Sequence, residues 1–339
     1  MYILIFLIFL LCALLTKEKP NFITLITLIV IFILIIGLRS PYIDQDYQNY
    51  LRESKYGSGI SEFTFYIFSN ISYSLTNSAV LMFVIYAVIT VPTQFYALYK
   101  HSNFFWISLL FFFPTYFVIL NMNAMRSGAA LGITMMAWSY WAERKTLITL
   151  GLIALATSLH YSFAILFLFY PIVRNNDKYL KVFLAAIPIV FAFHTLIDID
   201  EFFAFFSVIE FIAVKSNAYS TEDFEPVSIF STVILLRVAI VAALYYYREE
   251  LSKHNSLFYL FFKLYIVGLV LLVFIADIPP VAFRLLDIFA ASELVLLPMF
   301  LYTIKQRYIA LGGITVYAFL YFYINIILAQ NIKPYEMII

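Results

Sequence analysis

Twelve apolar runs limit what this chain can fold into. Each is long enough to span, or nearly span, the roughly 30 Å hydrocarbon core of a bilayer. Only 12% of the 339 residues are charged, too few to cover the surface of a soluble domain. In lipid the backbone must satisfy its own hydrogen bonds, so helices are expected. The sequence predicts an all-α integral membrane protein, a single-domain (1–339) polytopic bundle of about 12 transmembrane segments, at roughly 1–16, 20–38, 77–99, 103–120, 125–142, 146–160, 161–173, 180–197, 228–247, 257–275, 284–304 and 308–329.

The runs 146–160 and 161–173 are short and adjoin at "SLHYSF", so they form either a hairpin or one kinked helix. A hairpin places six short loops on one face, with 12 of the 21 Lys and Arg but only 5 of the 20 Asp and Glu. A single helix would abolish this bias. Because cytoplasmic loops are rich in Lys and Arg, we favour the hairpin, with both termini outside.

Two long connections, 39–76 and 198–227, lie on the outer face in this topology. Each contains an amphipathic piece, 61–75 in the first and 201–214 in the second, of the kind that rests at a membrane interface.

Arginines mark the outer ends of three predicted spans: Arg39, Arg126 and Arg284. A guanidinium matches phosphate with a planar fork of donors, so together they could hold a pyrophosphate. Arg126 stands in "NMNAMRSGAALG", in the first turn of its helix, where free N–H groups also favour an anion. The small residues that follow it permit close approach of a helix or ligand. The competing interpretation is interfacial snorkelling.

His160 is the candidate general base, beside Ser158 and Ser162 at the predicted hairpin tip. A lone membrane histidine is more often a packed structural residue. Asp44 and Asp46 form an Asp-x-Asp pair similar to that of metal-dependent sugar-nucleotide enzymes, but this tripeptide is common, and the competing interpretation is a solvated loop. Tyr47 and Tyr50 offer rings that could stack on sugars. With one cysteine and four scattered histidines, no metal or cofactor is predicted.

Arg237 falls deep inside a predicted span, and Glu293 lies at a similar depth in another. An unpaired arginine at mid-membrane is costly, so we expect Arg237 to pair with Glu293 or Asp287 as a structural contact. Lys263 lies near the cytoplasmic end of its span and is expected to snorkel to the surface.

Six motifs occur in order along the chain: "IDQDYQNYL" (43–51), "SEFTF" (61–65), "NAMRSGAAL" (123–131), "SLHYSFA" (158–164), "FRLLDIF" (283–289) and "IKPYE" (332–336). In these motifs the sequence resembles the EpsG-like branch of the Wzy polymerases, which assemble bacterial O-antigens and other exopolysaccharides. The resemblance covers nearly the whole chain except 198–227.

This resemblance implies a GT-C-like glycosyltransferase of the bacterial inner membrane with its active site facing the periplasm. It would transfer a glycan from undecaprenyl pyrophosphate to the non-reducing end of another lipid-linked repeat unit. Its partners would be these donor and acceptor lipids, membrane lipids and a chain-length regulator, with no nucleic acid. The resemblance carries over Asp46, Tyr50, Glu62, Arg126, His160 and Arg284. Together with the residue patterns above, we assign His160, Arg126, Arg284 and Asp46 to catalysis, and to substrate binding we assign Arg39, Asp44, Tyr47, Tyr50, Arg52, Glu62, Asn123 and Tyr335.

Three other functions compete with this one. A flippase or other transporter suits twelve spans, but transporters show internal repeats and midplane charges, whereas the ionisable groups here gather at one face. An O-antigen ligase would use the same chemistry with a different acceptor. A membrane acyltransferase would need an acyl-donor site on another face.

Overall fold

The computed structural model describes residues 1–16, 19–57, 61–196 and 225–338. Contacts divide the chain into two compact units, residues 1–172 with 294–339, and residues 173–293. Regular structure in the described ranges is helical, apart from two isolated β-bridges. This confirms the all-helical class, while the single-domain organisation stays a prediction.

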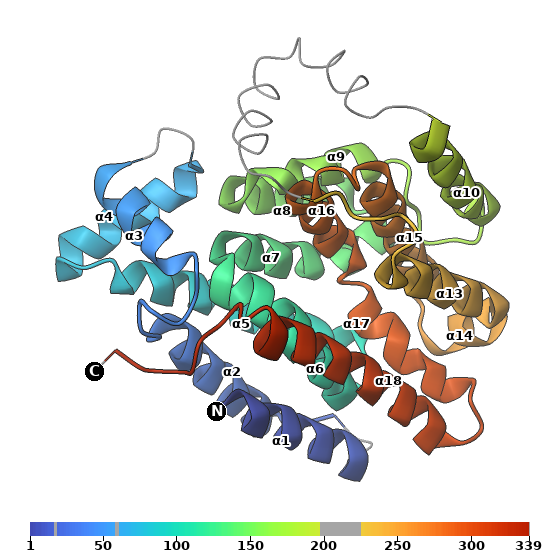
Figure 1. Cartoon of the computed structure of the whole chain (residues 1–339), viewed down its shortest axis with the longest axis horizontal. Coiled ribbons are helices and arrows are strands. Elements are labelled where there is room, and N and C mark those ends of the chain that lie inside the picture. The colour runs from blue at the N-terminus through green and yellow to red at the C-terminus, as the bar shows by residue number, and fades with distance from the viewer. Residues whose placement is uncertain (17–18, 58–60, 197–224, 339) are drawn as a thin grey trace. The chain divides into compact units, whose positions relative to one another are not determined.

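The first unit holds most of the helices (Figure 1). They are α1 (Tyr2–Leu15), α2 (Phe22–Gly37), α3 (Tyr47–Tyr56), α4 (Phe63–Thr76), α5 (Val80–His101), α6 (Phe105–Phe112), the π-helix η1 (Phe113–Asn123), α7 (Met125–Ala142), α8 (Thr146–Leu159), the 3₁₀-helix η2 (Tyr161–Ala164), α9 (Ile165–Phe169), the 3₁₀-helix η3 (Leu297–Tyr302), α18 (Arg307–Phe322) and the π-helix η4 (Tyr323–Leu328).

The second unit contains five helices among its described residues: α10 (Leu180–Leu196), α13 (Thr232–Tyr246), α14 (Arg248–His254), α15 (Phe258–Phe274) and α16 (Pro279–Ala290). The short α17 (Glu293–Leu296) continues the chain into the first unit.

Every predicted apolar run contains helix. Three described helical stretches are long and apolar enough to cross a membrane, Val80–His101, Phe105–Asn123 and Arg307–Leu328, and a bent pair over 279–302 makes a fourth. Six further apolar helices have 10–17 residues. The chain is therefore a helical protein with several membrane-spanning candidates, and the count of 12 stays a prediction.

The run 146–173 is a hairpin, as predicted. Helix α8 ends at Leu159, and His160 is extended, with φ −157° and ψ 120°. After this turn the chain runs back through α9. At its end the Tyr170 hydroxyl donates to Thr146 Oγ1 at the start of α8, over 2.9 Å. Arg144 also donates to the Tyr170 carbonyl over 2.9 Å.

Close packing of α5, α7 and η1 fixes where α7 begins. The buried Gln94 amide exchanges hydrogen bonds with Asn121 of η1 and donates to the Gly128 carbonyl over 2.9 Å. A side chain at Gly128 would stand 2.6 Å from Asn121 Oδ1, so only glycine permits this approach. This contact agrees with the small-residue interpretation of the segment after Arg126.

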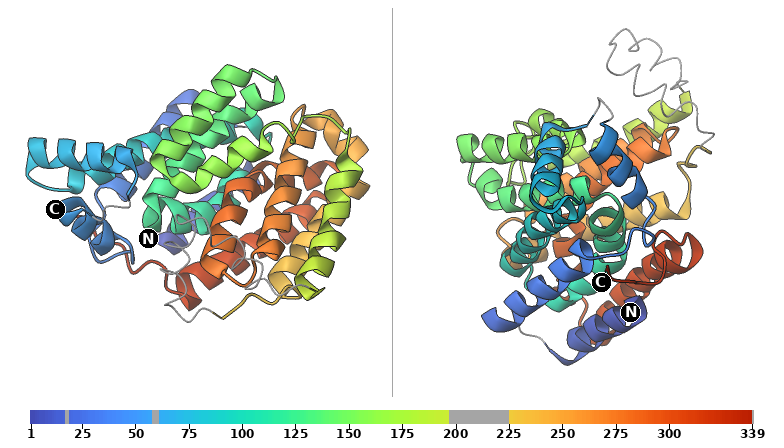
Figure 2. Two further views of the ribbon diagram at one scale, coloured as in Figure 1. Left: turned by 90° about the horizontal axis from the view of Figure 1, so that it is seen from above. Right: turned by 90° about the vertical axis from the view of Figure 1, so that its left-hand side faces the viewer.

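The C-terminal segment runs beside the chain that follows α2 (Figure 2). Ser40 N–H donates to the Glu336 carbonyl over 2.8 Å, and Lys333 N–H donates to the Ile43 carbonyl over 2.7 Å. These bonds bring the first and last motifs of the sequence together at one end of the first unit.

The second unit contains Arg237 and Lys263, the two charged residues whose contacts the sequence predicted. Arg237 Nη1 lies 2.7 Å from Glu293 Oε2, which confirms the predicted structural pair. The expectation for Lys263 was wrong, because its side chain is buried rather than directed to the surface. Its ammonium instead donates to the carbonyls of Arg174 and Lys178 and to Asn176 Oδ1, over 2.8–3.1 Å, and so holds that loop.

Outside the transmembrane candidates, the predicted amphipathic piece 61–75 is the helix α4, which exposes Phe63 and Leu75. The second predicted piece, 201–214, lies outside the described residues.

Candidate functional site

Glu62 joins three distant parts of the first unit. It stands immediately before α4, where its carboxylate is buried, with 4% of the side chain exposed. One oxygen lies 2.7 Å from Arg126 Nη1, and the other lies 2.8 Å from His160 Nδ1. The Tyr161 N–H donates to the same oxygen as His160, over 3.3 Å. Three predicted site residues, Glu62, Arg126 and His160, therefore meet in one cluster.

Arg126 is the second residue of α7, as the sequence predicted, but its guanidinium is already occupied. Besides Glu62, it contacts the carboxylate of Glu53, with Nη2–Oε2 at 3.3 Å and Nη1–Oε1 at 3.4 Å. The guanidinium carbon also lies 5.2 Å from the ring centre of Tyr50 and 4.9 Å from that of Phe65. With 19% of its side chain exposed, Arg126 is reachable, but an incoming anion must compete with a carboxylate.

The hydrogen bond to Glu62 determines which ring nitrogen of His160 carries the hydrogen. Burial alone would raise the pKa of Glu62, but the hydrogen bond from His160 and the charge of Arg126 outweigh burial and lower this pKa to about 2. An ionised carboxylate only accepts hydrogen bonds, so His160 Nδ1 must carry the hydrogen. In the neutral ring Nε2 then holds the lone pair. Ser162 Oγ lies 3.2 Å from Nε2, so a hydroxyl group fits within hydrogen-bonding distance of this nitrogen.

Arg39 differs from its predicted role at the substrate. Its side chain is fully buried, and each of its three nitrogens donates a hydrogen bond: to Asp44 over 2.6 Å, to the Ile36 carbonyl over 2.7 Å and to the Met122 carbonyl over 2.8 Å. Asp44 also accepts from the Tyr47 N–H over 2.7 Å. The pair fastens the end of α2 to η1 and to the start of α3, so neither Arg39 nor Asp44 has an exposed polar group for substrate.

The two loop tyrosines also depart from the expectation that they stack on sugars. Tyr47 is buried and stacks on Phe83, with ring centres 3.9 Å apart. Tyr50 is 5% exposed and supports the Arg126 guanidinium. Both rings belong to the packing beneath the cluster, because other side chains already cover their faces.

The remaining predicted residues of the first unit are Asp46, Arg52, Asn123 and Tyr335, and the contacts described for them are with residues outside the cluster. Asp46 is half-buried at the start of α3 and makes no capping bond. Arg52 is exposed and donates to Asn49 over 2.7 Å. Asn123 accepts from the Gln45 N–H over 3.3 Å, and the Tyr335 hydroxyl donates to the Ile35 carbonyl over 3.2 Å. Their roles in substrate binding stay predictions.

Arg284 belongs to the second unit, on α16, where it is exposed. Its predicted partnership with Arg126 at a pyrophosphate stays a prediction.

Glu53 is a site residue that sequence reasoning missed. It lies on α3 one turn after Tyr50, with 14% of its side chain exposed. The spacing offered a weak signal, since residues three apart share a helix face. Among the described residues, no group of three or more histidine, cysteine, aspartate and glutamate side chains could hold a metal ion.

Comparisons with known proteins cover nearly the whole chain. The model of the EpsG family matches residues 22–337. The amylovoran biosynthesis protein AmsC of Erwinia amylovora is 22% identical over 346 residues, an alignment that covers 95% of this chain and 90% of AmsC. No solved structure matches the chain.

Proposed function

The chain belongs to the EpsG family, and from this membership and the Glu62 cluster we propose that it is a polysaccharide polymerase. It transfers a glycan from undecaprenyl pyrophosphate to the non-reducing end of a second lipid-linked repeat unit. The contact that carries the proposal is the Glu62 carboxylate, which bridges Arg126 and His160. It couples a phosphate-binding cation to a base. The similarity to AmsC, named for amylovoran biosynthesis, supports an exopolysaccharide product.

Arg126 is the proposed ligand of the donor pyrophosphate. A guanidinium binds phosphate oxygens through paired, charge-assisted hydrogen bonds. Its position in the first turn of α7 adds the positive end of the helix. Negative charge develops on the leaving pyrophosphate, and fixed positive groups stabilise that charge in the transition state.

His160 is the proposed base. The acceptor hydroxyl attacks the anomeric carbon of the donor sugar, and the bond from that carbon to the phosphate oxygen breaks. The electron pair of this bond leaves with undecaprenyl pyrophosphate, and the hydroxyl proton passes to His160 Nε2. Glu62 holds the ring through Nδ1, which leaves Nε2, in contact with Ser162 Oγ, as the nitrogen that accepts the proton. A single displacement of this kind inverts the anomeric centre.

Arg284 and Asp46 complete the proposed machinery. Arg284 keeps its predicted role as a second phosphate-binding cation, and Asp46 is the proposed alternative base in the loop before α3. The reaction, as proposed, needs no metal, so EDTA should leave a reconstituted activity unchanged. We place the site at the periplasmic face of the bacterial inner membrane, because the loops on the opposite face carry the excess of Lys and Arg.

The test is Arg126→Ala in cells that make the polysaccharide. We expect a surface lipid capped by a single repeat unit, with a normal amount of protein in the membrane. Arg248→Ala is the matched control, because Arg248 pairs with its neighbour Glu249 on α14. Full-length chains from Arg126→Ala would refute the role of Arg126.

Deletion of the gene separates polymerase from the competing functions. Loss of a polymerase leaves single-repeat lipid, whereas loss of a flippase or ligase leaves no capped lipid. A deletion strain without single-repeat lipid would therefore contradict the proposed function.

A further inference from the structure

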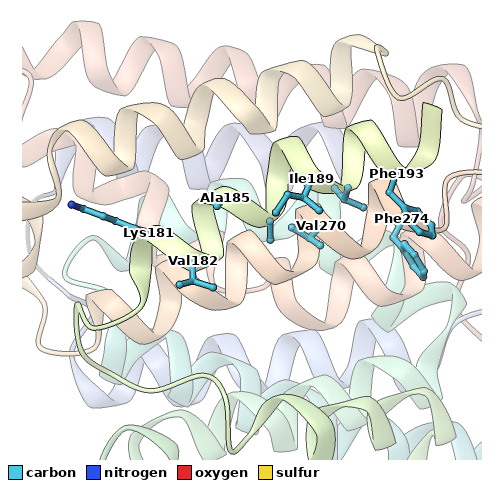
Figure 3. Close-up of a pocket in the computed structure, with 9 residues that line it drawn as sticks. Lys181, Val182, Ala185, Ile189, Phe193, Val270 and Phe274 are labelled. Atoms are coloured by element: carbon cyan, nitrogen blue, oxygen red, sulfur yellow. The ribbon is translucent and has the colours of Figure 1, made fainter. Parts of the chain in front are cut away.

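A long apolar groove follows α10 and α15 in the second unit (Figure 3). Its volume is about 550 Å³, within the range of pockets that hold one small ligand. Apolar side chains line it from Val182 past Ile189 to Phe193 and Phe274, and among the described residues that line it the charged one is Lys181.

Small side chains and a ring pair shape this groove. Ala185 and Ala186 line it midway along α10, where larger residues would fill the space. At the far end the rings of Phe193 and Phe274 lie 5.5 Å apart. The groove therefore has a charged end and an aromatic end.

Positive charge gathers at the Lys181 end. The segment 174–181 carries three cations and one anion, a net charge of +2. The buried ammonium of Lys263 adds to this charge and holds the segment through hydrogen bonds to residues 174, 176 and 178. Lys181 is also the second residue of α10, beside the positive end of that helix. An anion is favoured at this end.

We propose that the groove holds one hydrocarbon chain of an anionic phospholipid, with the lipid phosphate at Lys181. From Lys181 to Phe193 the helix rises about 18 Å, from twelve steps of about 1.5 Å. One leaflet of the hydrocarbon core is about 15 Å thick, half of about 30 Å. The groove and a single acyl chain anchored at Lys181 are therefore of similar length, and the apolar lining disfavours a polar ligand. This lipid site shares no residue with the Glu62 cluster and does not depend on the proposed function.

The experiment measures lipid retained by the purified full chain, using native mass spectrometry and equal additions of phosphatidylglycerol and phosphatidylcholine. We expect the wild type to retain mainly phosphatidylglycerol. Lys181→Gln should lower this retention about fivefold, which corresponds to the roughly 1 kcal/mol that one lysine contributes at an anionic lipid surface. Ile189→Trp, which fills the groove from an exposed position, should lower retention of both lipids.

Lys305→Gln is the matched control, because Lys305 is an exposed lysine in a loop that the sequence places on the same membrane face. It should leave lipid retention unchanged. Thermal unfolding of each variant confirms that it is folded.

Three outcomes would overturn the proposal. In the first, Lys181→Gln and Ile189→Trp are folded and retain phosphatidylglycerol as the wild type does. In the second, undecaprenyl phosphate displaces the bound phosphatidylglycerol, which identifies a polyprenyl chain as the occupant. In the third, Ile189→Trp dissociates an oligomer without changing lipid retention, which assigns the groove to a second copy of the chain.

Discussion

We predict that Glu53→Gln strengthens binding of the donor lipid. The substitution removes a negative charge beside Arg126, the proposed ligand of the donor pyrophosphate. Glu53 occupies two donors of Arg126, which a pyrophosphate would need. The substitution keeps the size of the side chain but abolishes its negative charge. The incoming phosphate then meets a weaker competitor and one less repulsive charge.

The size of the effect follows from the geometry. The Arg126–Glu53 contacts of 3.3 and 3.4 Å are longer than the 2.7 Å contact to Glu62 and longer than a strong charge-assisted bond of about 2.7–2.9 Å. Both side chains are partly exposed, which limits such a pair to about 1 kcal/mol. Removing the competition should tighten binding about fivefold, since about 1.4 kcal/mol would give tenfold.

The assay is equilibrium binding of undecaprenyl pyrophosphate to the purified chain in discs of uncharged lipid. Glu249→Gln is the control, because it makes the same charge change on the exposed surface of α14, and it should leave the dissociation constant unchanged. Weaker binding by Glu53→Gln, with a matching loss of polymer, would refute the reasoning. That result would mean that Glu53 holds Arg126 in its working position.

Two further predictions concern stability. Gly128→Ala places a methyl group 2.6 Å from Asn121 Oδ1 and should destabilise the fold by about 1–3 kcal/mol, seen as a lower thermal unfolding temperature. Gly151→Ala, whose added methyl group meets nothing within 4 Å, is the control and should not be destabilising. Because the pKa of Glu62 is lowered from 4.5 to about 2 in the fold, its ionised form contributes about 3 kcal/mol above pH 4.5. This contribution is lost as the pH falls from about 4.5 towards 2, so acid unfolding of Glu62→Gln should show a smaller loss over that range, and an unchanged acid limb would contradict the assignment.

The helices could be predicted from the sequence because their cause is local. A run of apolar residues in lipid must satisfy its backbone internally, so each of the twelve runs contains helix. The hairpin at 146–173 followed from charge, since only that topology gathers the basic loops on one face. The Arg237–Glu293 pair followed from the cost of an unpaired buried charge.

The partners of the site residues could not be predicted in the same way. Arg39 is buried because the Met122 carbonyl, 83 residues away, lies at the end of a π-helix beside it. No pattern of hydropathy encodes that contact. Glu53 was missed for a similar reason: its charge looks like any solvated carboxylate until α3 packs against α7. The sequence indicates which side chains reach the same end of the bundle, whereas tertiary packing decides which of them are already paired.

The position of Glu62 between Arg126 and His160 would link donor binding to proton transfer in the proposed reaction. Glu62 shares its negative charge between Arg126 and His160. When a pyrophosphate takes donors from Arg126, the hold of Arg126 on Glu62 weakens, and more of the carboxylate's charge acts on the imidazole. The bound pyrophosphate adds negative charge nearby. In the proposed reaction, both changes would favour transfer of the acceptor's hydroxyl proton to His160. A carboxylate between the proposed phosphate ligand and the proposed base would therefore couple the two substrates, which an arginine and a histidine placed separately would not do.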